Sequence, residues 1–227
     1  MHGLENLDKG SFPGAGNYGT PPIEPVRGKA PAQWLSFNYA KRCTAPADKG
    51  LHFFVDDYQF VRLWNAPDRY LELLRRFACV CTPDFSLYTD MPPAMQIYNH
   101  YRKHWLAAYW QQNGISVIPT ISWSTPDSYA WCFDGEPVGG MVAVSSVGCM
   151  ARDETKQLFL QGYEEMLRRL KPSEVIFYGK VPLECDWNVR RIPPHYERME
   201  KARGKQHGRQ GSGQRNQPEW QSVRHGV

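Results

Sequence analysis

Two periodicities of hydrophobic residues alternate through the central part of the chain. Short continuous apolar runs are typical of strands that are buried on both faces, and the segments between them repeat their apolar residues every three or four positions, as amphipathic helices do. The runs predict strands over residues 51–55, 78–82, 115–121, 141–144 and 175–178, and the segments predict helices over residues 58–77, 92–112, 126–133 and 153–170.

This alternation predicts the α/β fold class. Successive strands are separated by roughly 25–35 residues, the length of one βα unit, and such units build a largely parallel sheet covered by helices. About five units are too few for a closed barrel of eight strands, which needs about 250 residues. We therefore expect a largely parallel sheet, in either a partial TIM-barrel-like arrangement or an open doubly wound arrangement.

The two ends of the chain differ in composition from its centre. The first fifty residues are rich in Pro and Gly, so a helix cannot run through them, although Trp34 and Phe37 would anchor an extended segment to a domain. Towards the C-terminus, Gly, Gln, Arg, His and Ser replace the aliphatic residues, which is typical of a disordered segment. We expect an N-terminal arm over residues 1–50, an α/β domain over residues 51–200 and a disordered basic tail over residues 201–227.

The formal net charge of +4 is concentrated in this tail. Residues 201–227 hold six basic residues and one acidic residue, a local charge of +5, so the remaining chain carries a charge of −1. A folded nucleic-acid-binding face would instead spread positive charge over the domain. The tail could neutralise phosphates without a fold, or it could be a terminus that only aids solubility. Its candidate nucleic-acid contacts are Arg203, Lys205, Arg209 and Arg215.

Membrane and metal sites are not indicated by the sequence. No apolar run approaches the roughly 20 residues that span a bilayer, so we expect a cytoplasmic protein with no membrane partner. The six cysteines form no Cys-x-x-Cys pair, and reduced thiols are the expected state. Cys79 and Cys81 share a strand face, and His100 and His104 share a helix face as in a metal half-site, but further ligands are not evident for either pair. The sequence therefore predicts no metal site and leaves any cofactor unknown.

Polar residues follow every predicted strand, at the edge where parallel α/β sheets bind their ligands. Asp84 lies several residues before the next helix can begin, so helix capping explains it poorly, and we expect it to be catalytic with support from Asp56 or Asp57. Asp56 and Gln59 also have capping-box spacing, and Asp90 could cap a helix. The substrate-binding candidates are Ser86, Tyr88, Asp90, Ser122, Trp123, Ser145, Ser146, Gly148 and Tyr178.

Aromatic residues are frequent on the predicted helix over residues 92–112. Core packing explains their three- and four-residue spacing, and stacking against a base is the alternative. The sequence contains no Walker-type Gly-Lys-Ser/Thr, no Gly-x-Gly-x-x-Gly and no Gly-x-Ser-x-Gly, which argues against familiar kinase, dinucleotide-binding and hydrolase sites.

Several strings of the sequence resemble one protein family. The matching strings are residues 53–60, 83–92, 117–123 and 142–149, closed by Tyr178 and Gly179, and the resemblance extends from about residue 17 to residue 180. The family is bacterial and phage-borne and is known as domain of unknown function four-four-one-seven. The resemblance implies a phage or mobile-element origin, with the host cytoplasm as the location, and it brings no established reaction.

The strand ends at residues 84–86 and 145–148 are also similar to those of barrel-fold transglycosylases that exchange a nucleic-acid base. This likeness implies that Asp84 stands where a carboxylate nucleophile or acid acts, and that residues 145–148 hold a base. The chain is shorter than those enzymes and lacks their zinc-cysteine cluster.

Three classes of function remain open at this point. We expect an enzyme that acts on a nucleotide or a nucleic-acid base, with Tyr88 and Trp123 stacking against the ring. One alternative is a non-catalytic accessory protein of a phage or mobile element that binds nucleic acid or a host protein through its tail and arm. Another is a structural component of a virion.

Overall fold

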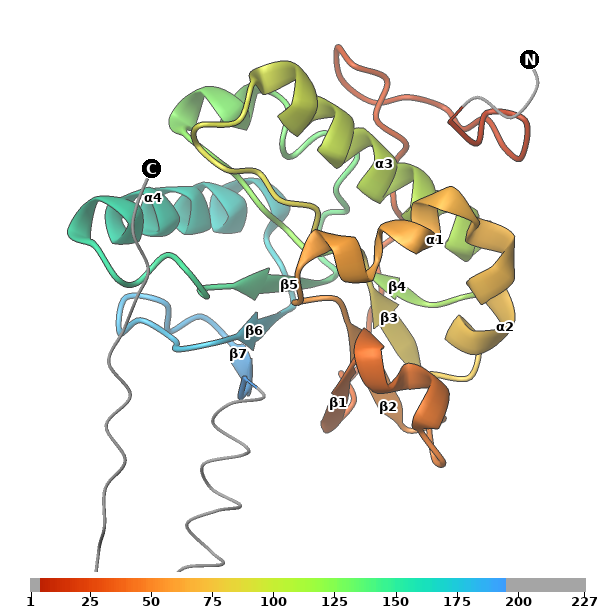
Figure 1. Ribbon diagram of the computed structural model, residues 1–227. Helices are drawn as coiled ribbons and strands as arrows, with labels where there is room; N and C mark the ends of the chain where they lie inside the picture. The colour runs from red at the N-terminus through yellow and green to blue at the C-terminus, as the bar shows by residue number, and fades with distance from the viewer. Residues whose placement is uncertain (1–4, 195–227) are drawn as a thin grey trace, which may run out of the picture. The chain divides into compact units, whose positions relative to one another are not determined.

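Parallel strands form the centre of the structure (Figure 1). The computed structural model describes residues 5–194. Four strands form one sheet in the order β1-β2-β3-β4, three form a second sheet in the order β5-β6-β7, and each of these pairings is parallel. The strands are β1 Gln33–Ser36, β2 Lys49–His52, β3 Cys79–Cys81, β4 Val117–Ile118, β5 Met141–Ser145, β6 Glu174–Tyr178 and β7 Val189–Ile192.

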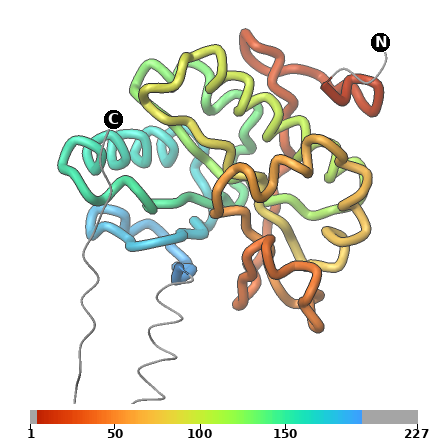
Figure 2. The backbone as a smooth tube through the Cα atoms, viewed as in Figure 1, coloured from red at the N-terminus to blue at the C-terminus, as the bar shows by residue number. Residues whose placement is uncertain are grey.

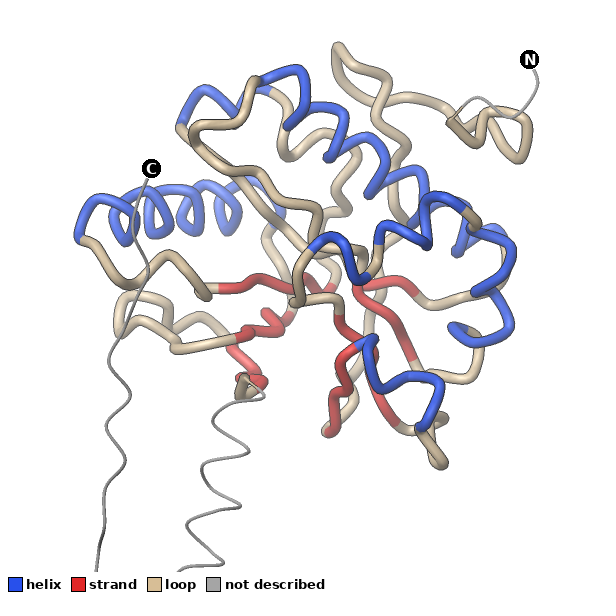
Figure 3. The backbone as a smooth tube through the Cα atoms, in the orientation of Figure 1, coloured by secondary structure: helices blue, strands red, loops and turns tan. Residues whose placement is uncertain are grey.

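The two sheets meet at a parallel bridge between Thr120 and Ala143. The backbone N–H of Ala143 donates to Pro119 O, and its carbonyl accepts from the N–H of Ile121, both at 2.8 Å. Strand order therefore follows chain order across both sheets, without the reversal that defines a doubly wound sheet. The predicted α/β class with parallel strands is confirmed, and the strands within residues 5–194 do not close into a barrel (Figure 3).

All five predicted strands are present as β2 to β6, whereas β1 and β7 lie outside the predicted set. β1 belongs to the segment predicted as an arm, and its Trp34 is buried while the strand pairs with β2. In β7, Arg190 and Arg191 interrupt the apolar pattern, and Arg190 pairs with Glu174 of β6 at 2.7 Å. Neither strand has the continuous apolar run that marks a strand with two buried faces.

The two long helices match the sequence pattern closely. α3 spans Pro93–Gln112 and α4 spans Asp153–Leu170. α4 ends as predicted, because Lys171 adopts a left-handed conformation with φ of 46° and Pro172 follows. No helix in the described part of the chain is both long and apolar enough to cross a membrane.

The helix predicted over residues 58–77 is broken into short pieces. α1 covers Val61–Asn65, α2 covers Leu71–Leu74, and a 3₁₀ turn over Pro67–Tyr70 lies between them. Pro67 has no backbone N–H to continue a helical ladder, which explains the break. Further 3₁₀ turns cover Phe37–Arg42, Asp57–Gln59 and Pro126–Ala130.

The N-terminal segment packs along α3 (Figure 2). The indole N–H of Trp105 donates to Gly10 O at 3.0 Å, and the Phe12 ring meets the Trp105 ring edge-on. Further along, the Gln111 amide and the Glu24 backbone exchange two hydrogen bonds of 2.9 Å. Because α3 is covered by this segment as well as by the core, several of its polar residues are buried: Gln96, Asn99, His100, Lys103 and His104.

Candidate functional site at the carboxyl ends of the parallel strands

Asp84 lies just beyond the end of β3, at the carboxyl edge of the four-stranded sheet. Pro83 and Phe85 on either side of it are buried, and Asp84 itself is partly exposed. Shielding from water by the surrounding protein is the main cause that raises the pKa of Asp84 to about 7; among nearby charges, Lys103 lowers this pKa and Asp57 raises it. The Asp84 carboxyl group can therefore hold or release a proton near neutral pH.

Asp57 joins the loop after β2 to the loop after β3. Its carboxylate accepts hydrogen bonds from the backbone N–H of Ser86 at 3.1 Å and from the Ser86 hydroxyl at 2.9 Å. The Ser86 carbonyl accepts from Asn99 of α3 at 2.7 Å, and Arg102 donates to Asn99 at 2.7 Å. The Arg102 guanidinium also lies over the Phe85 ring, 3.8 Å from its centroid. These contacts hold both loops against α3, and they give Ser86 a positioning role.

Lys103 carries a buried positive charge from α3 towards the strand ends. Its Nζ donates to Thr120 O at 2.9 Å and to Glu136 Oε1 at 2.7 Å. Thr120 forms the bridge that joins the two sheets, so Lys103 supports that junction. The same ammonium lowers the pKa of Asp84, which links the buried ion pair to the partly exposed carboxyl group.

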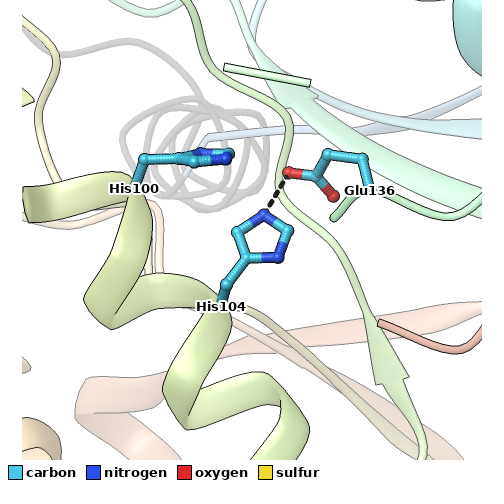
Figure 4. Close-up of side chains that lie close together, drawn as sticks. All are labelled: His100, His104 and Glu136. Atoms are coloured by element: carbon cyan, nitrogen blue, oxygen red, sulfur yellow. Dashed lines mark hydrogen bonds and ion pairs between the residues drawn. The ribbon is translucent and has the colours of Figure 1, made fainter. Parts of the chain in front are cut away.

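Two histidines and a glutamate converge beside Lys103 (Figure 4). His100 and His104 lie one turn apart on α3, with ring centroids 4.4 Å apart. Nε2 of His104 is 2.9 Å from Oε1 of Glu136. One potential ligand atom from each of the three buried side chains lies within 4.8 Å of the other two. This set of nitrogen and oxygen atoms could hold a metal ion.

Backbone carbonyls orient both imidazole rings. Nε2 of His100 is 3.0 Å from Asp134 O, and Nδ1 of His104 is 2.9 Å from Pro21 O. Burial, followed by the neighbouring His104 and Lys103, lowers the pKa of His100 well below its usual range. Burial raises the pKa of Glu136, but the adjacent ammonium and imidazole outweigh burial and leave this pKa below its usual value.

The end of β4 holds two of the substrate-binding candidates, Ser122 and Trp123. Ser122 is partly exposed. The indole N–H of Trp123 donates to Leu158 O at 3.2 Å, and its ring packs against Phe159 with centroids 5.4 Å apart. Trp123 thus packs on α4, where a close approach is allowed by Gly162.

The ends of β5 and β6 contain both internal and exposed groups. Ser145 Oγ accepts from the N–H of Val147 at 3.2 Å, and the buried Ser146 hydroxyl donates to Lys180 O at 2.7 Å. Gly148 is exposed and has a positive φ of 87°. The Tyr178 ring stacks on Phe54 and also contacts His52, with centroids 4.8 Å and 5.0 Å apart. These contacts give Ser146 and Tyr178 structural partners at the strand ends.

Three other candidates are exposed. The Asp56 carboxylate accepts from the side-chain amide of Gln59 at 3.3 Å, while no side-chain cap bonds the backbone of the turn. Tyr88 is 63% exposed, and Asp90 is exposed rather than capping α3, whose N-cap is Pro92. The candidates Arg203, Lys205, Arg209 and Arg215 lie outside the described residues.

Three residues of the site are absent from the sequence candidates: Lys103, Glu136 and Cys149. Burial raises the pKa of the Cys149 thiol, and the Asp84 carboxylate raises it further. The charge of Asp84, after β3, therefore acts on Cys149, after β5. A signal for Lys103 exists in the helical spacing of His100, Lys103 and His104, which places three polar groups on one face of α3. Glu136 lies in a loop and has no comparable signal.

One family model and two phage proteins match the chain. A family model described as "Domain of unknown function (DUF4417)" matches residues 12–194. The "Gene 1 protein" of Mycobacterium phage L5 is 39% identical over 197 residues, which cover 84% of this chain and 85% of the relative. The "Gene 1 protein" of Mycobacterium phage D29 is 38% identical over 196 residues, which cover 84% of this chain and 72% of the relative. No solved structure matches the chain at a significant level.

The family match includes both clusters described above, from Pro21 to Cys149. It confirms the resemblance that the sequence strings indicate. The similarity to phage proteins also agrees with the expected phage or mobile-element origin. The chain belongs to the family described as Domain of unknown function (DUF4417).

Proposed function

We propose that this protein is an enzyme that acts on a nucleotide or a nucleic-acid base, with Asp84 as its general acid–base or nucleophile. The observation that carries the proposal is the position of three charged groups from separate segments at the carboxyl ends of the strands. The Asp57 carboxylate is hydrogen-bonded to Ser86, two residues after Asp84, and the charges of Asp57 and Lys103 both act on the pKa of Asp84. Asp84 follows β3, Asp57 follows β2, and Lys103 approaches from α3. Catalytic residues of parallel α/β proteins come from this end of several strands.

The chemistry of these three groups supports proton transfer. A catalytic acid or base works best when its pKa lies near the working pH, and the pKa of Asp84 is raised to about 7. The Lys103 ammonium would stabilise the carboxylate that forms when Asp84 gives up a proton. The Asp57 carboxylate would oppose this effect, because its negative charge raises the pKa of Asp84. Two hydrogen bonds from Ser86 hold the Asp57 carboxylate in place.

The substrate class rests on analogy and on exposed groups near the site. The sequential parallel strand order is compatible with a partial barrel, and base-exchanging transglycosylases have a barrel fold. In that comparison, Asp84 takes the place of the acidic catalytic group and residues 145–148 take the place of the base-binding loop. Tyr88, Val147 and Gly148 are exposed residues that a ring could contact.

Base release or exchange tests the proposal directly. The full chain would be incubated with nucleotides, single-stranded DNA, RNA and a labelled free base, and products followed by mass spectrometry. We expect the wild type to release or incorporate a base. In Asp84→Asn, we expect the rate of this reaction to fall roughly 100-fold or more. Asp8→Asn changes an exposed acid of the N-terminal segment and is the control, whose turnover should equal that of the wild type.

Two results would contradict the proposal. One is a folded Asp84→Asn variant that turns over as fast as the wild type, which would remove Asp84 from the mechanism. The other is a wild-type chain that neither releases nor exchanges a base with any of these substrates, which would remove the substrate class.

A second candidate function is nucleic-acid binding through the C-terminal tail. The observation in its favour is the local charge of +5 over residues 201–227. Deleting these residues should then abolish a salt-dependent affinity for DNA or RNA, because that affinity comes from phosphate neutralisation. An enzyme that works at the strand ends should keep its activity on a small nucleotide after the same deletion.

A further inference from the structure

We propose that His100, His104 and Glu136 bind one divalent transition-metal ion of the zinc type. Two imidazole nitrogens and one carboxylate oxygen are a ligand set that Zn²⁺ accepts, and three protein ligands leave a fourth position for water or another ligand. Mg²⁺ and Ca²⁺ prefer oxygen ligands and fit this set poorly. The inference does not depend on the acid–base role of Asp84.

The positions of the ligand atoms support a single shared ion (Figure 4). His100 and His104 project from one face of α3, and Glu136 approaches them from the loop before β5. The separation of 2.9 Å between His104 Nε2 and Glu136 Oε1 is a little shorter than the roughly 3.3–3.6 Å between neighbouring ligands of a tetrahedral ion with Zn–N and Zn–O bonds of about 2.0–2.2 Å. A small outward shift of one side chain would therefore admit the ion. All three ligand atoms lie within 4.8 Å of one another.

The hydrogen bonds of the two rings orient a free nitrogen for metal binding. A carbonyl oxygen only accepts, so the nitrogen that faces it must carry the proton. Nε2 of His100 donates to Asp134 O, and Nδ1 of His104 donates to Pro21 O. In a neutral ring the other nitrogen then keeps its lone pair. Histidine ligands of metals are usually held by this kind of second hydrogen bond.

Two buried atoms of the cluster have no hydrogen-bond partner among the described residues. They are Nδ1 of His100 and Oε2 of Glu136, in residues that are only 2% and 8% exposed. Leaving polar atoms buried and unpaired is unfavourable, and most native proteins avoid it. An ion bound by Nδ1 of His100 and by both carboxylate oxygens of Glu136 would give both atoms a partner, whereas Lys103 and His104 contact only Oε1 of Glu136.

Lys103 is a built-in competitor for the metal. Its ammonium lies 2.7 Å from Glu136 Oε1, so an ion bound by Glu136 would be close to a second positive charge. Like charges at such a distance repel each other strongly in a buried site. Removing the Lys103 charge should therefore strengthen metal binding, which is the opposite of what is expected if Lys103 only stabilises the fold.

The test is a Zn²⁺ titration of the full chain after treatment with a chelator. We expect one Zn²⁺ per chain by equilibrium dialysis, and no comparable binding of Mg²⁺. His100→Gln should weaken Zn²⁺ binding roughly tenfold or more, as loss of a ligand does. Lys103→Met should tighten it at least about tenfold. Cys79→Ser and Cys81→Ser, which change two of the six free cysteines, should leave it unchanged.

Cobalt spectra identify the ligands even if a variant fails to fold. Wild-type protein loaded with Co²⁺ should show visible bands without the intense near-ultraviolet absorption of a cobalt–thiolate bond. The proposal is overturned by a wild-type chain that binds no Zn²⁺, or by a thiolate band in the Co²⁺ spectrum. It is equally overturned by folded His100→Gln and Lys103→Met variants whose Zn²⁺ affinity equals that of the wild type.

Discussion

The ammonium of Lys103 lies 2.7 Å from Oε1 of Glu136, and their side chains are only 2% and 0% exposed. The pair connects α3 to the loop before β5. Inside a protein, each charge of such a pair depends on the other, because neither can be solvated by water. The pair therefore holds together two parts of the fold that the sequence separates by more than thirty positions.

Loss of the lysine charge should destabilise the protein strongly. In Lys103→Met, Glu136 keeps only its contact with His104, so a buried carboxylate loses its ammonium partner. We expect the free energy of unfolding to fall by about 3–5 kcal/mol. Urea denaturation in the presence of a chelator measures this loss without a contribution from metal.

A double variant is the control for this loss. In Lys103→Met/Glu136→Gln, the unpaired negative charge is gone, so the loss of stability should be smaller than in Lys103→Met alone. If the free energy of unfolding of Lys103→Met lies within about 1 kcal/mol of the wild-type value, the buried Glu136 carboxylate does not need the Lys103 ammonium.

Asp84 should make stability depend on pH. Its pKa is about 7 in the folded chain, against an ordinary value of 3.8, so between these values the folded chain retains a proton that the unfolded chain has lost. The free energy of unfolding therefore decreases as pH rises from about 4 to about 7, and the contribution is fully lost above that range. Asp84→Asn removes this effect.

The Asp84→Asn variant should gain stability relative to the wild type as pH increases. Between pH 5 and pH 8 the difference in unfolding free energy should grow by roughly 1–3 kcal/mol, since one pKa unit corresponds to about 1.4 kcal/mol. Asp90→Asn controls for general charge effects. A difference for Asp84→Asn that stays constant with pH would show that the carboxyl group titrates as it does in the unfolded chain.

The sequence predicts the buried strands and the long helices because each has a clear pattern. The run Met141 to Val144 is apolar and buried, and the apolar positions of α4 recur at helical spacing up to the stop at Lys171. β1 and β7 lack such runs, since β7 carries Arg190 and Arg191. Such strands are stabilised by pairing with their neighbours, which depends on the whole sheet rather than on local sequence.

The candidate site is only partly predictable for the same reason. Asp57 and Asp84 follow predicted strands, and the parallel topology brings them together. Glu136 meets His104 through a contact between positions 32 residues apart, and no local pattern marks such a partner. Trp123 has the right position at a strand end, but the adjacent glycine in α4 lets its ring pack against that helix.

The position of the Trp123 ring should make glycine necessary at residue 162, because the ring occupies the space that a side chain would need. A Cβ atom at residue 162 would overlap with the indole ring of Trp123, which donates to Leu158 O at 3.2 Å. Gly162→Ala should therefore displace the ring and lower the free energy of unfolding by about 1–3 kcal/mol, despite the better helix propensity of Ala. Chemical denaturation measures the loss.

The same substitution in a Trp123→Leu background is the control. Without the indole ring, the added methyl group has room, and Ala should be neutral or stabilising by up to about 1 kcal/mol. An equal loss in both backgrounds would place the cause elsewhere in α4.

Two substitutions should shift the pKa of Asp84 in opposite directions, which tests the electrostatic coupling at the site. Asp57→Asn removes a negative charge that raises the pKa of Asp84, so this pKa should fall below about 7 while burial keeps it above its ordinary 3.8. Lys103→Met removes a positive charge that lowers the same pKa, which should then rise above about 7. Both shifts are measurable from the carboxyl carbon signal of Asp84 in an NMR titration, with Asp90→Asn as a control that should leave the signal unchanged.

The two substitutions remove charges of opposite sign. A general loosening of the loops would instead shift the pKa of Asp84 in the same direction in both variants. Shifts in one common direction would therefore contradict the direct coupling of Asp84 to Asp57 and Lys103.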